Sequence, residues 1–260
     1  MFLNHHRTGT GEPLVLIHGI GHRWQGWQPV IERLQGEREL IAIDLPGFGQ
    51  TPMPPPGTPP GIVSLADLVG AFLDELGLER PHVAGNSLGG WLAFELAKRG
   101  RVRSATGLSP AGFQSRAESR FSYSSLWLAR RASRMIDGRT DQLLGVPGAV
   151  KLGFGQLSVH PERIPPDALA GDVHALAQAP WFDATLVAIT NAAFTGGEEI
   201  QVPVTVAWGA QDRLLLPRQA ERAGRAIPSA RVLMMEGCGH VPFHDDPDQV
   251  ARVLLEASAG

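Results

Sequence analysis

The chain contains only one cysteine, Cys238, among its 260 residues. A single cysteine cannot form an internal disulfide, and it provides no cysteine cluster for structural zinc. No group of His, Asp and Glu has metal-ligand spacing either, so we expect neither a metal nor a cofactor. A chain without disulfides is compatible with a reducing compartment, and we expect a cytoplasmic protein.

Long apolar runs and an excess of basic residues are also missing. No stretch reaches the roughly 20 apolar residues that a membrane span needs, and residues 1–13 do not resemble a secretory signal. The formal net charge is −3, from 23 basic and 26 acidic residues, which provides no basic surface for nucleic acid or anionic membranes. We therefore expect a small-molecule substrate as partner, with no nucleic acid and no membrane span. The oligomeric state stays open.

Short apolar runs bounded by turn residues recur along the chain and predict buried β-strands. They are apolar on both faces and alternate with helical patterns, which indicates an α/β protein with a doubly wound, mostly parallel sheet. A shortened antiparallel strand is expected within residues 1–6. The other predicted strands cover residues 13–19, 39–47, 81–87, 104–110, 202–209 and 230–237.

Three further segments stand out from this alternation. A helix is predicted from residue 64, where Ser64 and Asp67 resemble a capping box. The proline-rich segment 51–61, TPMPPPGTPPG, is expected to be a stiff surface loop. Residues 113–181 lack a clear strand and contain arginine-rich helical patterns, so we expect a helical insertion over one edge of the sheet.

Ser87 lies in the stretch Gly85-Asn86-Ser87-Leu88-Gly89-Gly90, where a predicted strand becomes a predicted helix. A serine in such a sharp turn takes unfavourable backbone angles, and small residues two positions away relieve the crowding. The turn also places the hydroxyl at a helix N-terminus. A phosphate-binding glycine loop is the alternative, but the glycines do not fit G-x-G-x-x-G and no G-K-[ST] follows. We therefore predict that Ser87 is a nucleophile.

Two later strand ends carry candidates for a base and an acid. His240 follows the strand at 230–237, and Asp212 follows the strand that ends near Trp208. Active residues of open α/β sheets gather at the carboxyl ends of the strands, so we expect both side chains to lie beside Ser87. His244 is the local rival of His240. The alternative for Asp212 is a helix cap or a solvated turn residue.

The stretch LVLIHGIGHRW supplies a candidate oxyanion hole. Gly19 follows the first predicted parallel strand and lets the backbone turn, so that the next N–H can face the substrate oxygen. We assign the two donors to the backbone N–H groups of Ile20 and Leu88. His18 is expected to pack and hydrogen-bond beneath this loop rather than to act as a base.

The apolar side chains of the insertion either line a substrate pocket or form the insertion's own core, and the second interpretation is favoured for most of them. Its arginines, among them Arg116, Arg120, Arg130, Arg131 and Arg134, are expected to form a solvated helix face. The apolar insertion residues considered are Phe121, Tyr123, Trp127, Leu128, Leu143, Leu144, Phe154, Trp181 and Phe182. The candidate pocket residues are Trp24, Trp27, Phe113, Trp127, Trp181 and Val241.

Together these motifs resemble the α/β-hydrolase superfamily. The matching stretches are HGIG from His18, DLPGFGQT from Asp44, GNSLGG from Gly85, WGAQDRLLLP from Trp208 and GCGHVPFHDDP from Gly237. The resemblance implies the α/β-hydrolase fold with a helical cap inserted after the sixth strand. Its domains would be a core formed by residues 1–112 and 182–260 and a cap formed by residues 113–181. It further implies that Asp44 holds a structural turn.

The residue type at position 87 limits the activities that the resemblance implies. The haloalkane dehalogenase and epoxide hydrolase branches have aspartate where this chain has Ser87, whereas esterases, lipases and C–C-bond hydrolases have serine. The resemblance thus implies a serine hydrolase, carboxylesterase-like, that cleaves a small to medium apolar ester through an acyl-enzyme. The alternatives are a C–C-bond hydrolase of vinylogous diketones from aromatic ring cleavage, a lactonase or perhydrolase, and a non-catalytic ligand-binding relative.

Overall fold

A seven-stranded sheet forms the centre of the molecule, in the order β1-β3-β2-β4-β5-β6-β7. The computed structural model describes residues 1–146 and 148–259. β1 pairs antiparallel with β3, and every other pair is parallel, which confirms the predicted doubly wound, mostly parallel sheet. The strands are β1 His5–Gly9, β2 Glu12–Ile17, β3 Arg38–Ile43, β4 His82–Asn86, β5 Ser104–Leu108, β6 Val204–Gly209 and β7 Arg231–Met235.

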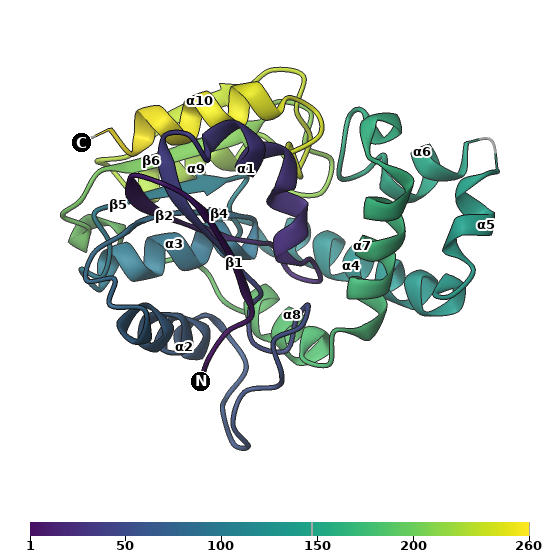
Figure 1. Ribbon diagram of the computed structural model, residues 1–260, viewed down its shortest axis with the longest axis horizontal. Helices are drawn as coiled ribbons and strands as arrows, with labels where there is room; N and C mark the ends of the chain where they lie inside the picture. Colours follow the sequence, from purple (N-terminus) through teal and green to yellow (C-terminus); the bar gives the residue numbers. More distant parts are fainter. Residues whose placement is uncertain (147, 260) are drawn as a thin grey trace.

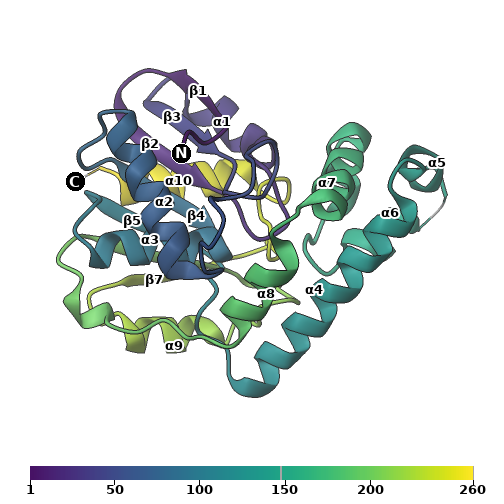
Figure 2. The same ribbon diagram turned by 90° about the horizontal axis from the view of Figure 1, so that it is seen from below.

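Helices cover both faces of the sheet (Figures 1 and 2). Alternate residues of β2 point to opposite faces, so Leu14 and Leu16 pack in one apolar cluster and Val15 and Ile17 in the other. Burying each such side chain contributes about 1.5–3 kcal/mol. The first cluster includes residues of α1 (Gln28–Leu34) and α10 (Pro247–Ala257), and the second includes residues of α2 (Ile62–Glu75), α3 (Leu88–Lys98) and α9 (Gln219–Ala226).

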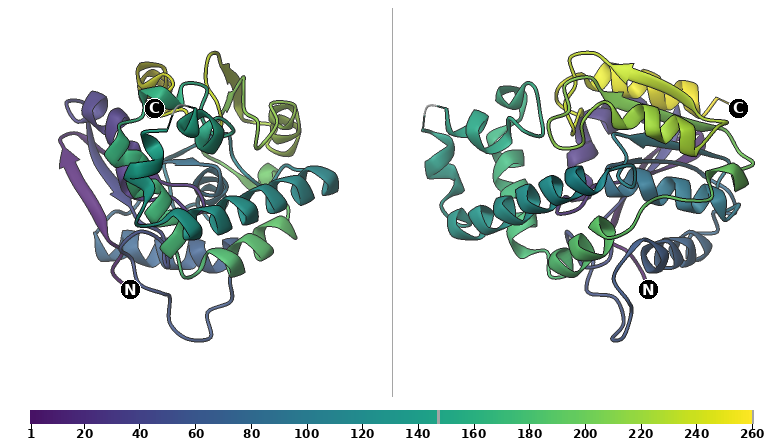
Figure 3. Two further views of the ribbon diagram at one scale, coloured as in Figure 1. Left: turned by 90° about the vertical axis from the view of Figure 1, so that its right-hand side faces the viewer. Right: turned by 180° about the vertical axis from the view of Figure 1, so that it is seen from behind.

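The chain between β5 and β6 is helical and forms a lobe beside the sheet (Figures 1 and 3). Its first helix begins with a capping box, in which the Ser115 hydroxyl and the Glu118 carboxylate each accept from the other residue's backbone N–H. The predicted absence of strands in this part of the chain is confirmed for the residues described. The helices are α4 Arg116–Ile136, α5 Thr140–Leu144, α6 Ala149–Phe154, α7 Pro166–Gln178 and α8 Phe182–Thr190, with 3₁₀ turns at Pro161–Arg163 and Gly197–Glu199.

The position of this insertion in the strand count was predicted wrongly. It follows β5, the fifth strand of the described chain, and not a sixth. The reason is that β1 alone precedes β2. β1 itself begins later than expected, because its register places His5 opposite Ile43 and Gly9 opposite Glu39. The limits of a separate cap domain at residues 113 and 181 stay a prediction.

Three local predictions are also corrected. α2 begins at Ile62 after Gly61, which has φ of 134°, so Ser64 lies inside the first turn and forms no cap. β7 is partly exposed because it is an edge strand, whereas both of its faces were expected to be buried. Arg130 is buried rather than solvated: its Nε lies 3.4 Å from Asp183 Oδ1 and it donates to the Leu176 carbonyl at 3.2 Å.

Other local predictions are confirmed. Residues 51–61 contain no helix or strand. The Asp44 carboxylate holds the turn after β3, because it accepts from the backbone N–H groups of Trp24 and Gln50 and from the Asn4 amide. None of the helices described is long and apolar enough to cross a membrane. The expected cytoplasmic location stays a prediction.

Candidate active site

Ser87 sits between the end of β4 and the start of α3 with φ of 54° and ψ of −114°. Of the residues described, only Ser109 is another non-glycine residue with positive φ. Glycines make this turn possible: a Cβ on Gly85 would lie 2.1 Å from the Gly89 carbonyl carbon, and one on Gly89 would lie 2.2 Å from the Ile17 oxygen. Such a backbone costs about 1–3 kcal/mol and persists only where the surroundings enforce it. The geometry is the strained strand-to-helix turn expected from the sequence.

Asp212 and His240 form a buried pair, with His240 Nδ1 2.7 Å from Asp212 Oδ2. The other carboxylate oxygen of Asp212 accepts from the backbone N–H groups of Leu214 and Leu215, each at 2.8 Å. The carboxylate is therefore fixed on both sides. Because Nδ1 donates to it, the neutral imidazole carries its lone pair on Nε2, where it can accept a proton.

Asn86 connects the Ser87 turn to the His240 loop. Its Nδ2 donates to the carbonyls of Leu108, at 3.0 Å, and His240, at 2.8 Å. Ser87 and His240 line the same cavity, although no hydrogen bond joins their side chains in the structure. The three predicted residues Ser87, Asp212 and His240 are thus brought together at the carboxyl ends of β4, β6 and β7.

The Gly19 turn packs directly against Ser87, since a Cβ on Gly19 would lie 3.2 Å from Ser87 Cβ. His18 Nδ1 donates to the Gly19 carbonyl at 2.7 Å, and the Leu45 N–H donates to His18 Nε2 at 2.9 Å. A trans peptide directs its C=O and N–H to opposite sides, so this hydrogen bond also fixes the direction of the Ile20 N–H. Leu88 begins α3, where a backbone N–H has no helical partner.

His18 is buried beneath this loop and makes the hydrogen bonds expected of it. Burial lowers its pKa to about 4, against the opposing effect of the Asp44 charge. The ring is therefore neutral at neutral pH. That state agrees with the hydrogen bonds, because a neutral imidazole can donate from Nδ1 and accept at Nε2.

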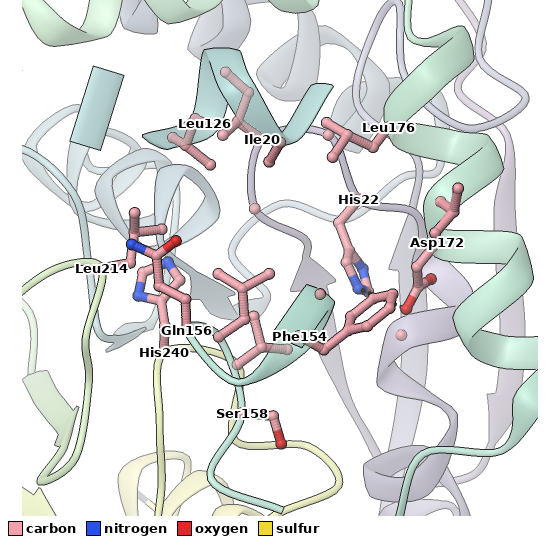
Figure 4. A pocket seen from close by; sticks show the side chains of 18 of the residues that line it. Ile20, His22, Leu126, Phe154, Gln156, Ser158, Asp172, Leu176, Leu214 and His240 are labelled. Carbon is pink, nitrogen blue, oxygen red and sulfur yellow. Dashed lines mark ion pairs between the residues drawn. The ribbon is translucent and has the colours of Figure 1, made fainter. Parts of the chain in front are cut away.

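A cavity of about 210 Å³ opens in front of Ser87 and His240 (Figure 4). Most of its wall is aliphatic or aromatic and comes from the helical insertion and from the loops after β2, β6 and β7. Examples of these lining residues are Ile20, Leu126, Phe154, Leu157, Leu176 and Leu214. The insertion thus provides one wall of the candidate site.

Of the six candidate pocket residues, Val241 lines this cavity. Trp27, Phe113 and Trp181 are absent from its described wall because they are buried in the core. Trp27 packs against Phe243 with ring centroids 4.1 Å apart, and Phe113 belongs to the opposite cluster. The sequence patterns made all three pocket candidates, although Trp181 was also among the insertion residues for most of which a core position was favoured.

The other two candidates lie outside the described cavity wall for different reasons. Trp24 stacks on His6 with ring centroids 4.5 Å apart. Trp127 is 41% exposed on α4, with the Arg131 guanidinium 4.7 Å from its ring centroid. Among the apolar insertion residues considered from the sequence, only Phe154 lines the cavity.

A comparison with protein families identifies the family of the chain. A model of the alpha/beta hydrolase family matches residues 14–253, which is most of the chain. The chain belongs to the alpha/beta hydrolase family. The matched range contains the Gly19 turn, Ser87 and the His240 loop. The chain is thus a hydrolase with the α/β-hydrolase fold.

Individual relatives of this α/β-hydrolase differ in the reaction that they are named for. It is 33% identical to epoxide hydrolase EphH of Mycobacterium tuberculosis, over 73% of this chain and 91% of that protein. It is 30% identical to lipase 3 of a Moraxella species, over 90% of this chain and 73% of the relative. A 2-hydroxy-6-oxo-2,4-heptadienoate hydrolase of Pseudomonas putida is 39% identical over 37% of this chain and 36% of its own length. Family membership is therefore clear, and the substrate is a separate question.

One residue that supports the site of this hydrolase was missed from the sequence. The Asp245 carboxylate accepts from the backbone N–H groups of Gly239, Val159 and His160 and from the Ser158 hydroxyl. It thereby joins the loop of His240 to the insertion. The motif that contains His240 also contains the acidic pair Asp245-Asp246, which could have indicated a supporting carboxylate. The partners of Asp245 at residues 158–160 are far away in the chain, so the pairing itself could not be predicted.

A pair of residues that lines the cavity was also missed. His22 and Asp172 both line the cavity, and Figure 4 shows them across it from His240. His22 lies three residues beyond Gly19, so the sequence could have predicted that it lies near the site, in the loop after β2. Asp172 comes from α7, and nothing in the sequence indicated which face of that helix meets the core.

Proposed function

We propose that this α/β-hydrolase is a serine hydrolase that cleaves a small to medium, apolar ester through an acyl-enzyme. One observation carries the proposal: Ser87, held at φ of 54°, shares an apolar cavity with a His240–Asp212 pair whose Nδ1–Oδ2 distance is 2.7 Å. A hydroxyl is a weak nucleophile until a base accepts its proton, and the pair supplies such a base with a fixed tautomer.

In the proposed mechanism, Ser87 Oγ attacks the acyl carbon while its proton passes to His240 Nε2. The backbone N–H groups of Ile20 and Leu88 stabilise the resulting oxyanion. Asp212 stabilises the imidazolium, which then gives its proton to the leaving alcohol. Water attacks the acyl-enzyme with His240 as base, and Ser87 regains its proton as the acid departs.

The nucleophile argues for an acyl substrate rather than an epoxide. A carboxylate that opens an epoxide forms an ester, which water can hydrolyse. A serine hydroxyl would form an ether, which has no acyl carbon for water to attack. The name of the mycobacterial relative is therefore not carried over to this chain, and its lipase relative has the name closer to the proposed chemistry.

A C–C-bond hydrolase of vinylogous diketones is the second candidate. It is favoured by the 39% identity to the heptadienoate hydrolase, although that similarity covers 37% of this chain. Turnover of a ring-cleavage dienol far above ester turnover would establish this activity instead. Lactone hydrolysis and perhydrolysis are measured beside the ester and dienol reactions. Tight ligand binding with turnover that Ser87→Ala does not change would indicate a non-catalytic relative.

The test combines covalent labelling with turnover. Wild type is expected to react with a serine-directed fluorophosphonate and to cleave short p-nitrophenyl esters, whereas Ser87→Ala does neither. Ser229→Ala is the matched control, because Ser229 is exposed in the turn after α9 and should label and turn over normally. If Ser87→Ala still labels and still cleaves the esters, the proposed mechanism is wrong.

A further inference from the structure

The cavity has a second polar end that the proposed mechanism does not use. His22, from the loop after β2, and Asp172, from α7, line it on the side opposite His240 (Figure 4). Ile20 and Phe154 lie between the two ends in this view, and Leu176 lies on the side of His22 and Asp172. A mostly apolar pocket with a few fixed polar groups orients its ligand through those groups.

The second end is a cluster of charged residues held by their own contacts. His22 Nε2 lies 3.4 Å from Asp172 Oδ2, and Arg23 Nε lies 3.3 Å from Asp172 Oδ1. Burial alone would lower the pKa of His22 and raise that of Asp172. The opposite charges and hydrogen bonds outweigh burial in both, so the pKa of His22 is raised and that of Asp172 is lowered. The contacts favour an imidazolium beside a carboxylate as well, because both ring nitrogens of His22 face oxygen acceptors.

The donors of this cluster are engaged, and what it still offers a ligand is an acceptor. The imidazolium has two N–H groups: Nδ1 lies 3.1 Å from the Arg23 carbonyl, and Nε2 faces Asp172. Both donors of His22 are thus engaged. A carboxylate has about four acceptor positions, and Asp172 uses one on each oxygen for His22 and Arg23. The capacity that remains at the cavity wall is that of an acceptor.

The charge of the cluster also limits which chemical group of a ligand can bind there. His22 and Arg23 are cations and Asp172 is an anion, so the group carries a net positive charge and disfavours an ammonium. An anion would need free donors, and those of His22 are engaged. His244 also lines the cavity. Burial lowers its pKa against the raising effect of Asp172, so its ring is neutral at neutral pH and adds no positive charge. At Asp172 itself, a neutral hydrogen-bond donor is the group that fits.

We propose that Asp172, positioned by His22 and Arg23, is a subsite for a hydroxyl group at the end of the substrate remote from the scissile bond. This inference rests on the proposed ester hydrolysis and names its substrate class as a hydroxylated ester. The aliphatic wall between the two polar ends holds the intervening carbon chain. A carboxylate that accepts from a substrate hydroxyl selects strongly against the analogue that lacks it.

The same contacts also tie the sheet loop to the insertion, because Arg23 additionally donates to the Ala168 carbonyl at 3.4 Å. A purely structural role would make Asp172 important for every substrate alike. A hydroxyl subsite makes it important only for substrates that carry the hydroxyl at the right distance. Selectivity between matched substrates therefore separates the two roles.

The first experiment measures kcat and KM for p-nitrophenyl esters of straight-chain acids and of their ω-hydroxy counterparts, with four to ten carbons. For wild type we expect the hydroxyl to raise kcat/KM about 10-fold at one chain length, mainly through KM, as a hydrogen bond to a charged acceptor allows. Asp172→Ala should remove this preference, which is read as the ratio of kcat/KM between the two matched esters and so does not depend on how the loss of the ion pairs changes turnover of both. Asp183→Ala is the control, since Asp183 pairs with Arg130 and Arg134 outside the described cavity wall and should keep the preference.

The second experiment separates this inference from the proposed function. Binding of ω-hydroxy esters and parent esters to Ser87→Ala is measured by calorimetry, which needs no turnover. Tighter binding of one hydroxy ester, lost in Ser87→Ala with Asp172→Ala, supports the subsite even if wild type cleaves no ester. Equal binding of the two series at every length, or equal losses for both in Asp172→Ala, overturns it.

Discussion

Asn86 donates from Nδ2 to the backbone carbonyl of His240 at 2.8 Å, across 154 positions of the chain. The residue before the proposed nucleophile therefore holds the loop of the proposed base. The same amide group donates to the Leu108 carbonyl at 3.0 Å, which ties both to the end of β5. Position 86 thus sets the relative placement of Ser87 and His240 without contact with the reacting atoms.

We expect Asn86→Ala to lower kcat about 10-fold or more with little change in KM, because a misplaced base loses effectiveness while the apolar cavity remains. It should also lower the free energy of unfolding by about 1–3 kcal/mol, since the buried His240 carbonyl loses its side-chain donor and the Leu108 carbonyl keeps only the Ser87 N–H. Steady-state kinetics and urea unfolding measure the two effects. Asn191→Ala is the control, because the exposed Asn191 only donates to the Val187 carbonyl. An unchanged kcat would contradict the positioning role.

Asp212 is predicted to matter through the tautomer of His240. In Asp212→Asn the amide can present its N–H₂ to Nδ1, which favours the imidazole with its proton on Nε2, where it cannot accept from Ser87. We expect kcat to fall by about 10⁴-fold while the fold is retained. Circular dichroism and ester turnover test this, with Asp183→Asn as the matched control on α8. A loss below about 10-fold would mean that the Asp212–His240 contact is structural only.

The placement of the three candidate catalytic residues could be predicted from the sequence, because each of them follows an apolar run that predicts a strand. Chain direction in a parallel sheet fixes which ends of the strands meet, so Ser87, Asp212 and His240 had to lie at one edge. The strained turn could be predicted as well, since glycines at positions 85 and 89 are required by the contact between strand and helix.

The cavity wall could not be predicted in the same way. Large aromatic side chains such as Trp27 and Trp181 stabilise the protein most when they are buried, and both lie in the hydrophobic core. The wall instead consists mainly of aliphatic residues of helices such as Leu126 and Leu176. Which face of α4 or α7 meets the core depends on helix packing, and that packing joins residues far apart in the chain. The pairing of His22 with Asp172 was out of reach for the same reason.

His18 is predicted to support the oxyanion hole indirectly. Removing its ring in His18→Ala frees the Gly19 carbonyl from one hydrogen bond and loosens the Gly19–Ile20 peptide. We expect kcat to fall about 10-fold to 100-fold, less than or equal to the effect of losing an oxyanion donor outright. Binding of a boronic acid transition-state analogue should weaken in parallel. His174→Ala, which alters a histidine exposed on the insertion, should change neither quantity, and a His18→Ala enzyme with normal kcat would exclude this role.

His18 also predicts how stability depends on pH. Its pKa is about 4 in the folded chain, against 6.5 for an ordinary histidine, so the unfolded chain binds more protons between these values. Its contribution to the free energy of unfolding is therefore complete above pH 6.5 and decreases as the pH falls toward 4, by up to about 3 kcal/mol. His22 has a raised pKa and acts in the opposite direction, so the comparison uses the difference between wild type and His18→Gln. Urea unfolding at several pH values between 4 and 7.5 should show a smaller acid loss in the variant, and identical slopes would contradict the assignment.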